Sequence, residues 1–137
     1  MGMPKTPALT TDCVIRDNEG RVLLIRRKNE PFKGAYALPG GFVDIGETVE
    51  AACRREVFEE AGVVVGELHL VGVYSDPRRD PRGHTVSIAF VTLLPRAPRA
   101  KAGSDAEAAE WVKDWRNVDL AFDHAEIIAD AEKIRPV

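Results

Sequence analysis

The sequence predicts an α/β fold built on a mixed β-sheet. Runs rich in Val, Ile and Leu occur before and after a helical segment, and an amphipathic segment lies near the C-terminus. Each of these elements has one apolar side to bury, so strands and helices should pack in layers. With 137 residues, 45% of them hydrophobic, the chain is long enough for one domain, which we expect to span residues 1–137.

The first part of the chain predicts antiparallel strands. Residues 1–7 are expected to form a flexible N-terminus, and the runs at 10–16 (TTDCVIR) and 21–27 (RVLLIRR) are typical of β-strands. The intervening DNEG has the composition of a hairpin turn, so the two strands should pair antiparallel. A short strand is expected at 35–38, followed by a turn at 39–41 (PGG), which residues with a β-carbon would enter with difficulty.

A helix is predicted after Gly46. Thr48 is a suitable N-cap because its hydroxyl can accept a backbone N–H of the first turn. Gly62 suits the C′ position at which helices end. These limits give a helix of about four turns.

The second half of the chain predicts two further strands and a second helix. Strands are expected at 68–74 and 85–94, and residues 109–113 fit either a strand or the end of a helix. Apolar residues recur at helical spacing near the C-terminus, which predicts an amphipathic helix over 125–134.

Composition limits the classes of partner. The net charge is −3 and the pI is about 5.6, so neither a nucleic-acid polymer nor an anionic membrane surface is an expected partner. The two cysteines, Cys13 and Cys53, lack metal-ligand spacing and should be buried, reduced thiols. No run approaches the length of a membrane span and the start lacks a signal-peptide core, so we expect a cytoplasmic location.

Three glutamates gather on one face of the predicted helix. At about 100° per residue, Glu56, Glu59 and Glu60 fall within an arc of about 100°. The usual alternative is a solvent-exposed acidic face. However, Glu56 and Glu60 repel each other at i, i+4, and the last two glutamates lie at the negative end of the helix dipole. Mg²⁺ or Mn²⁺ would relieve both costs because a hard cation accepts several carboxylate oxygens and still binds phosphate.

Neighbouring residues can complete such a metal platform. The PGG turn at 39–41 can bring backbone groups close to the metal and its ligand because its glycines carry no side chain. Glu47 precedes the helix, and an ion pair between Glu47 and Arg55 would pin the loop to the helix. Arg55 also reaches Glu59 at i+4 and offsets part of its charge.

The segment from residue 40 to 62 resembles the Nudix box with every position filled. Further stretches at 31–44, 79–84, 86–90 and 120–128 resemble ADP-ribose pyrophosphatases of the Nudix superfamily. The box positions are Gly41, Glu47, Arg55, Glu56, Val57, Glu59, Glu60, Gly62 and Val63.

The resemblance implies a Nudix-type α/β/α sandwich that uses Mg²⁺ or Mn²⁺. Carried over by position, Glu56, Glu59 and Glu60 match the metal-binding carboxylates and the Gly40 carbonyl matches a backbone ligand. Glu47 and Arg55 match the structural ion pair of the catalytic motif.

The general base has two candidate locations. One is Glu56 within the box. The other is an acidic residue on a later loop, Asp105 or Glu107. Members of the family differ in this respect, so both locations stay open.

The loop at 75–84 supplies candidate substrate ligands. Its arginines either serve as exposed, solubilising side chains or bind phosphate, for which the planar guanidinium is well suited. Arg79 and Arg82 are the candidates from the family-like RDPRG stretch. Phe32 or Tyr74 could stack on adenine, although an aromatic beside a strand is more often part of the core. The histidines His84 and His124 lack metal-ligand spacing and are expected to be structural.

The resemblance implies hydrolysis of ADP-ribose to AMP and ribose 5-phosphate by attack of metal-bound water. A house-cleaning hydrolase of modified nucleoside triphosphates would use the same box. Pro77 and Pro81 lie 14 and 18 residues after Val63, whereas many ADP-ribose hydrolases have a proline at about 15 or 16, so the substrate stays open between these classes. A third alternative is a non-catalytic nucleotide-sugar sensor. Relatives of this kind are frequently homodimers, and the sequence does not decide the oligomeric state.

Overall fold

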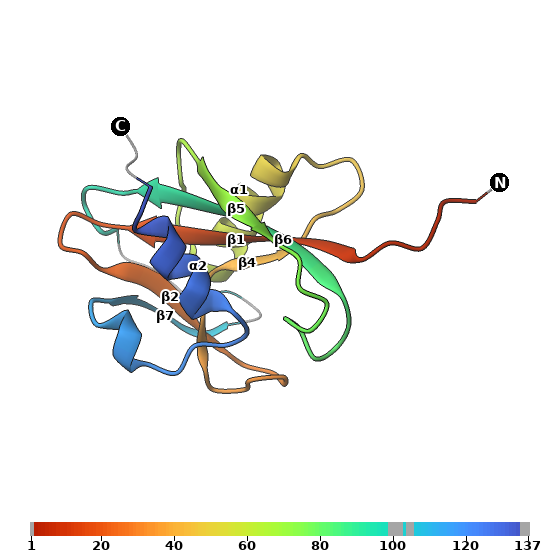
Figure 1. The fold of residues 1–137 in the computed structure, drawn as a ribbon. Helices are drawn as coiled ribbons and strands as arrows, with labels where there is room; N and C mark the ends of the chain where they lie inside the picture. Colours follow the sequence, from red (N-terminus) through yellow and green to blue (C-terminus); the bar gives the residue numbers. More distant parts are fainter. Residues whose placement is uncertain (1, 99–102, 104–105, 135–137) are drawn as a thin grey trace.

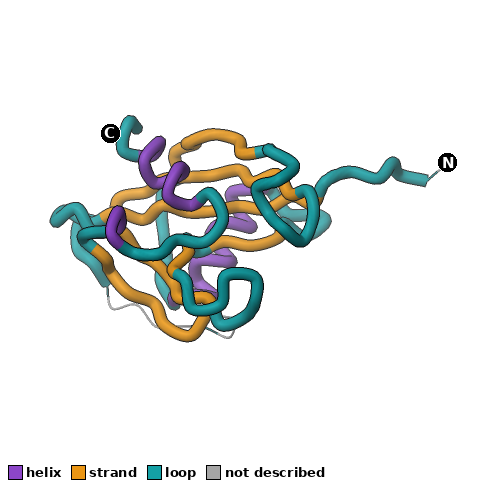
Figure 2. The backbone as a smooth tube through the Cα atoms, turned by 60° about the horizontal axis from the view of Figure 1, so that its bottom comes forward, coloured by secondary structure: helices purple, strands orange, loops and turns teal. Residues whose placement is uncertain are grey.

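The computed structural model describes residues 2–98, 103 and 106–134, and the chain is drawn in Figure 1. Residues 2–7 are exposed, carry no regular secondary structure, and extend away from the strands in Figure 2. The strands are β1 (Ala8–Arg16), β2 (Val22–Arg27), β3 (Tyr36–Ala37), β4 (Gly40–Phe42), β5 (His69–Tyr74), β6 (Thr85–Leu93) and β7 (Ala106–Val112). The helices are α1 (Val49–Ala61), the 3₁₀ turn η1 (Trp115–Asn117) and α2 (His124–Ala131).

All the described strands belong to one mixed sheet. Its main path runs β3-β2-β1-β6-β5, with β4 paired to β1 and β7 paired to β2. The central strands β1 and β6 are parallel from the pair Ala8↔Thr85 to the pair Arg16↔Leu93, whereas the other strand pairs are antiparallel. The predicted mixed sheet is therefore confirmed.

The strand β4 corrects the prediction of a simple turn at 39–41. Gly40, Gly41 and Phe42 pair antiparallel with the first half of β1. A β-carbon on Gly40 would lie 2.1 Å from the backbone oxygen of Thr11, so this close pairing depends on glycine. Tertiary pairing with β1 thus makes a strand of residues whose local propensity is that of a turn.

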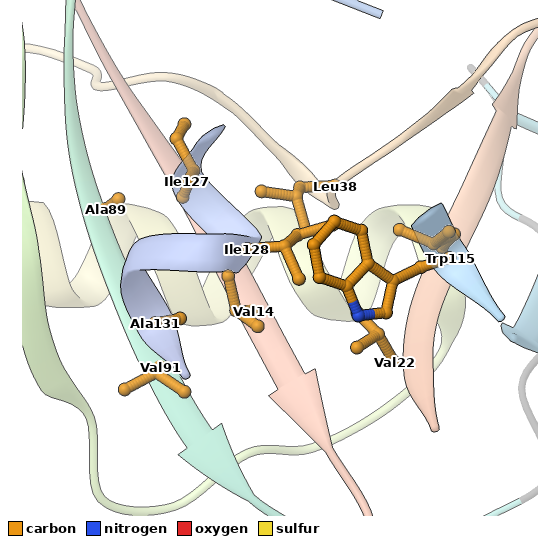
Figure 3. Close-up of a cluster of buried hydrophobic side chains, with 10 residues drawn as sticks. Val14, Val22, Leu38, Ala89, Val91, Trp115, Ile127, Ile128 and Ala131 are labelled. Carbon is orange, nitrogen blue, oxygen red and sulfur yellow. The ribbon is translucent and has the colours of Figure 1, made fainter. Parts of the chain in front are cut away.

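The two α-helices cover opposite faces of the sheet. Along β1, Val14 packs with Ile127 and Ile128 of α2, as Figure 3 shows. The flanking residues Cys13 and Ile15 point to the other face, where the apolar side of α1 packs against them. This period-two alternation produces an α/β/α sandwich, as expected.

The caps of α1 agree with the prediction. The Thr48 hydroxyl accepts the backbone N–H of Ala51 at 3.1 Å, and Gly62 has φ 66° and donates its N–H to the Phe58 carbonyl. These contacts satisfy backbone groups that have no partner inside the helix. The cap at Gly62 fixes where the glutamate face ends.

Other boundaries differ from the prediction by a few residues. Most of 109–113 lies in β7, where cross-strand pairing with β2 decides between the strand and helix alternatives. Helix α2 ends at Ala131, before the predicted 134, because Lys133 and Ile134 donate to carbonyls three residues back in a tighter turn. The cysteines Cys13 and Cys53 are buried and free, as expected. No helix in the described ranges has the length and apolar character needed to cross a membrane.

Candidate active site

The site forms where the last turns of α1 face β4. The backbone N–H of Gly40 donates to Oε1 of Glu60 at 3.0 Å and ties the strand to the helix. A β-carbon on Gly41 would lie 2.6 Å from Cδ of Glu56, so glycine leaves the space that this carboxylate occupies. Two of the predicted metal ligands therefore lie directly against the β4 backbone.

Arg55 connects the loop before α1 to the glutamates. Its guanidinium binds both carboxylate oxygens of Glu47, with Nε to Oε2 at 2.8 Å and Nη2 to Oε1 at 2.9 Å. Its Nη1 donates to Glu56 at 2.8 Å and to Glu59 at 3.2 Å. The hydrogen bonds from Arg55 lower the pKa of Glu47 to about 2. The ion pair expected between Glu47 and Arg55 is present.

The two inner glutamates carry an electrostatic cost. Glu60 is only 7% exposed, and burial together with the nearby Glu56 raises its pKa to about 9, against the effect of the Gly40 N–H. Burial also raises the pKa of Glu56, and Arg55 opposes this. A bound divalent cation would favour the charged form of both groups.

The donor set fits a hard divalent cation. The carboxylates of Glu56, Glu59 and Glu60 and the backbone oxygen of Gly40 are the oxygen ligands that Mg²⁺ and Mn²⁺ prefer. Over the described ranges, no three His, Cys, Asp or Glu side chains are already grouped closely enough to hold an ion. Glu59 is 53% exposed and is held by Arg55, so its carboxylate would have to leave Arg55 to join the other two.

Two adjoining cavities open beside these glutamates. The one over Glu56 has a volume of about 450 Å³. The second, smaller cavity extends toward β1 and the start of α2. Glu60, Arg27 and Arg82 line both cavities, together with β4. The cleft therefore brings acidic and basic side chains to one volume, which suits a phosphate ligand with its metal.

The two candidate arginines of the loop at 75–84 lie in different environments. The Arg79 side chain is 5% exposed, and it donates to Asp123 from Nε at 2.9 Å and from Nη2 at 2.7 Å and to Thr85 from Nη1 at 2.8 Å. The Arg82 side chain is 50% exposed and pairs with Asp80. Arg79 therefore joins the loop to the start of α2, whereas Arg82 is accessible from the cleft.

A buried polar network supports the β4 side of the cleft. Ser87 donates to Asp12 at 2.5 Å, and Nε2 of His124 lies 3.3 Å from Oδ1 of the same carboxylate. The other ring nitrogen, Nδ1, accepts the backbone N–H of Leu38 at 3.0 Å. His124 is therefore the neutral tautomer with its proton on Nε2, and it fixes the chain just before β4, in line with the structural role expected for it.

Comparison with known proteins identifies the family. A family model described as the NUDIX domain matches residues 6–135. The chain belongs to the NUDIX family. It is 52% identical over 125 residues to an ADP-ribose pyrophosphatase of Methanocaldococcus jannaschii, a match that covers 90% of this chain and 72% of that protein.

Regulators are also among the NUDIX relatives. The chain is 32% identical over 133 residues to the ADPR responsive transcriptional repressor NtrR of Acinetobacter baylyi, covering 92% of this chain and 53% of the repressor. It thus spans about half the length of that repressor. The NUDIX domain of Shewanella oneidensis NrtR, solved in complex with ADP ribose, superposes with a TM-score of 0.87 at 29% identity and covers 94% of this chain and 88% of that domain.

Two residues that line the cleft were not found by sequence reasoning. Arg27 ends β2, and Phe122 precedes α2, yet both line the cleft. Phe122 falls in the family-like stretch 120–128, but no local pattern relates it to Arg27, because only the sheet topology brings the two residues together. Phe32 stands edge-on to Phe122, with ring centroids 4.9 Å apart, and is not among the residues that line the two cavities.

The remaining candidates lie away from the cleft or outside the described residues. Tyr74 donates its hydroxyl to Asp130 at 2.7 Å and lines a separate surface hollow. Asp105 and the side chain of Glu107 fall outside the described residues. The backbone N–H of Gly103, nearby in sequence, donates to the Glu60 carbonyl at 2.8 Å, so Gly103 contacts the end of α1.

Proposed function

We propose that the protein hydrolyses the pyrophosphate bond of a nucleoside diphosphate derivative, with ADP-ribose as its substrate and AMP and ribose 5-phosphate as products. One observation carries this proposal: the cleft has box glutamates on one wall and the arginines Arg27 and Arg82 on another. Hydrolysis of a diphosphate needs both kinds of side chain. Its negative charge must be neutralised while water attacks a phosphorus and the bond to the bridging oxygen breaks. The 52% identity to an ADP-ribose pyrophosphatase supports the choice of substrate.

Glu56, Glu59, Glu60 and the Gly40 carbonyl would hold the divalent metal, Mg²⁺ or Mn²⁺. When bound, this ion supplies charge neutralisation for the diphosphate and lowers the pKa of the attacking water. The Gly40 N–H holds one oxygen of Glu60 in place, and Arg55 orients Glu56. Glu60 and Glu56, two of the four groups, are thus held in place before any ligand arrives.

The proton of the attacking water needs a carboxylate acceptor. Glu56 lines the larger cavity and is one candidate for this general base. Asp105 and Glu107 are the other candidates: Glu107 falls at the start of β7, and Gly103, nearby in sequence, contacts the Glu60 backbone. The diphosphate would be held by Arg82, with Arg79 acting through Asp123 to shape the loop. Phe32 would contact the adenine ring from beside Phe122.

The proposed partner is a small molecule in the cytoplasm. The net charge of −3 disfavours a nucleic-acid polymer as substrate. The buried, free thiols of Cys13 and Cys53 suit a reducing compartment. A homodimer is part of the proposal only by resemblance to relatives.

A panel of substrates tests the proposal. Purified protein is incubated with ADP-ribose, other nucleoside diphosphate derivatives and modified nucleoside triphosphates, with Mg²⁺ or with EDTA, and the products are identified by chromatography. We expect AMP and ribose 5-phosphate from ADP-ribose in Mg²⁺ and none in EDTA. Faster hydrolysis of a triphosphate would move the substrate to the house-cleaning class, while the metal site would stand.

A ligand-sensing role is the second candidate, because the chain also resembles an ADPR responsive repressor. A sensor would bind ADP-ribose without cleaving it. Calorimetric binding of ADP-ribose together with no turnover of any panel member in Mg²⁺ or Mn²⁺ would favour this role over catalysis.

A further inference from the structure

Phe122 has an unusual backbone for a bulky residue. Its φ is 53°, in the left-handed region, and Phe32, with φ 61°, is the other non-glycine residue with positive φ in the described part of the chain. A β-carbon makes this region unfavourable, and such residues concentrate at ligand sites when the surrounding structure holds them. Here the flanking backbone is held by hydrogen bonds from Ala121 N–H to Tyr36 O and from His124 N–H to Ala121 O.

The Phe122 ring lies under two guanidiniums. Cζ of Arg27 is 5.0 Å from the ring centroid, and Cζ of Arg82 is 5.7 Å from it. Both distances are within the range of a cation–π interaction. Arg27 ends β2, whereas Arg82 lies in the loop between β5 and β6, so the ring joins side chains from distant parts of the sequence.

The two arginines have like charges that oppose their approach. Burial and the charge of Arg82 lower the pKa of Arg27 from its ordinary value. Each guanidinium is also anchored elsewhere, Arg27 through Nε to the Pro31 carbonyl at 2.7 Å and Arg82 through Nε and Nη2 to Asp80. An anion with two charged groups, bound between them, would turn this repulsion into attraction.

We propose that Phe122 is a positioning residue whose ring, set by its left-handed backbone, holds Arg27 and Arg82 toward the diphosphate of the substrate. This inference rests on the proposed function, since it assigns a role within the same cleft. Phe122 acts through the arginines and does not itself bind the phosphates. Any nucleotide with a diphosphate, whether a nucleotide sugar or a nucleoside triphosphate, would use this arrangement.

The test uses α,β-methylene-ADP in Mg²⁺, because this diphosphate has no bridging oxygen to cleave. Its dissociation constant is measured by calorimetry for the wild type, Phe122→Leu, Phe122→Met and Phe122→Tyr. We expect Leu and Met to weaken binding about fivefold, because they keep apolar bulk and lose the ring. Tyr should keep the affinity within about twofold, because it restores the ring face.

Two further comparisons separate positioning from a general structural effect. In an Arg27→Gln background, Phe122→Leu should weaken binding only about twofold, because one guanidinium remains to be oriented. The matched control is Tyr36→Leu. Cζ of Arg26 lies 4.3 Å from the Tyr36 ring centroid, in a similar cation–π contact, and Tyr36 does not line the cleft. This control should leave the affinity unchanged.

Several outcomes would overturn the inference. These are a Phe122→Leu affinity equal to that of the wild type, a fivefold loss that persists in the Arg27→Gln background, or a wild type that does not bind the probe. Turnover of ADP-ribose by the wild type is measured in parallel. Turnover with unchanged Phe122→Leu affinity defeats the inference and leaves the proposed function standing. If the wild type does not turn over ADP-ribose but Phe122→Leu still weakens probe binding fivefold, the proposed function fails and the inference stands.

Discussion

Arg55 holds the Glu47 carboxylate through two hydrogen bonds, with Nε and Nη2 each donating to a separate oxygen. The same guanidinium reaches Phe42 of β4 and Glu56 of α1, so one side chain joins the strand, the loop and the helix that make the site. This bidentate geometry belongs to arginine, whose planar group presents donors in a fixed fork.

Replacing Arg55 by Lys should impair the site. We expect a lower melting temperature and a loss of kcat/KM on the order of 10–100-fold, because a single ammonium cannot hold both oxygens of Glu47 and still orient Glu56. Thermal unfolding and steady-state kinetics check this. Arg54→Lys is the matched control: within the described residues, the exposed Arg54 side chain hydrogen-bonds to the Gly66 carbonyl alone, and its replacement should change neither quantity. Equal effects of the two variants would contradict the role of Arg55.

The raised pKa of Glu60 should make the free energy of unfolding of the metal-free protein depend on pH. Burial raises its pKa from 4.5 to about 9, so between these values the native state holds a proton that the unfolded state has lost. Stability from this group is therefore full below pH 4.5 and is lost as pH rises to about 9. Glu60→Gln should remove this contribution to the slope, because the amide does not titrate.

Urea unfolding in EDTA between pH 6 and pH 9 measures this slope. Glu59→Gln serves as the comparison, since Glu59 is 53% exposed and should leave the slope unchanged. A Glu60→Gln protein that loses stability with pH as steeply as the wild type would show that the Glu60 carboxyl is not held neutral.

The glycines of β4 should respond differently to a methyl group. Gly41→Ala brings the methyl to 2.6 Å from the flexible Glu56 carboxylate, so we expect a folded protein with a displaced Glu56 and kcat lowered on the order of 100-fold. Gly40→Ala places the methyl against the rigid Thr11 backbone and should destabilise the fold itself. Gly66→Ala has open space and is the control. Full activity in Gly41→Ala would contradict the role of Glu56.

Replacing Arg79 should mainly lower the free energy of unfolding, whereas replacing Arg82 should mainly weaken substrate binding. Arg79→Gln leaves Asp12 and Asp123 without their buried cation, and we expect a loss of about 3–5 kcal/mol in the free energy of unfolding. Arg82→Gln removes a half-exposed guanidinium from the buried Asp80 but keeps the backbone N–H of residue 82 on that carboxylate, so it should cost less stability than Arg79→Gln, while KM rises. Chemical denaturation and kinetics distinguish the two. Wild-type stability in Arg79→Gln would mean that its guanidinium is available to the substrate.

The parts of the fold that follow from local chemistry were predictable. Thr48 and Gly62 mark the ends of α1 because capping depends on nearby backbone groups. The alternation of Cys13, Val14 and Ile15 indicates a strand buried on both faces. The glutamate face of α1 followed from helical geometry. The ion pair of Arg55 with Glu47, which precedes the helix, was expected as a link from loop to helix and matches the structural ion pair of the Nudix box.

The parts that depend on tertiary pairing were not predictable. Gly40 and Gly41 join the sheet only because β1 offers a partner, and their propensity is for turns. Arg27 and Phe122 meet through the folding of β2 beside the start of α2, and no sequence spacing relates them. The burial of Arg79 likewise depends on Asp123, which lies 44 positions along the chain.

Hydrolysis of ADP-ribose by the wild type and by the double variant Glu59→Gln, Glu60→Gln is the most direct test of metal-dependent cleavage at this site. Both proteins are assayed in Mg²⁺ and Mn²⁺, with unfolding curves to show that each is folded. The wild type should release AMP and ribose 5-phosphate, and the double variant should release neither while remaining folded. Full activity in the double variant would contradict the assignment of these glutamates as metal ligands.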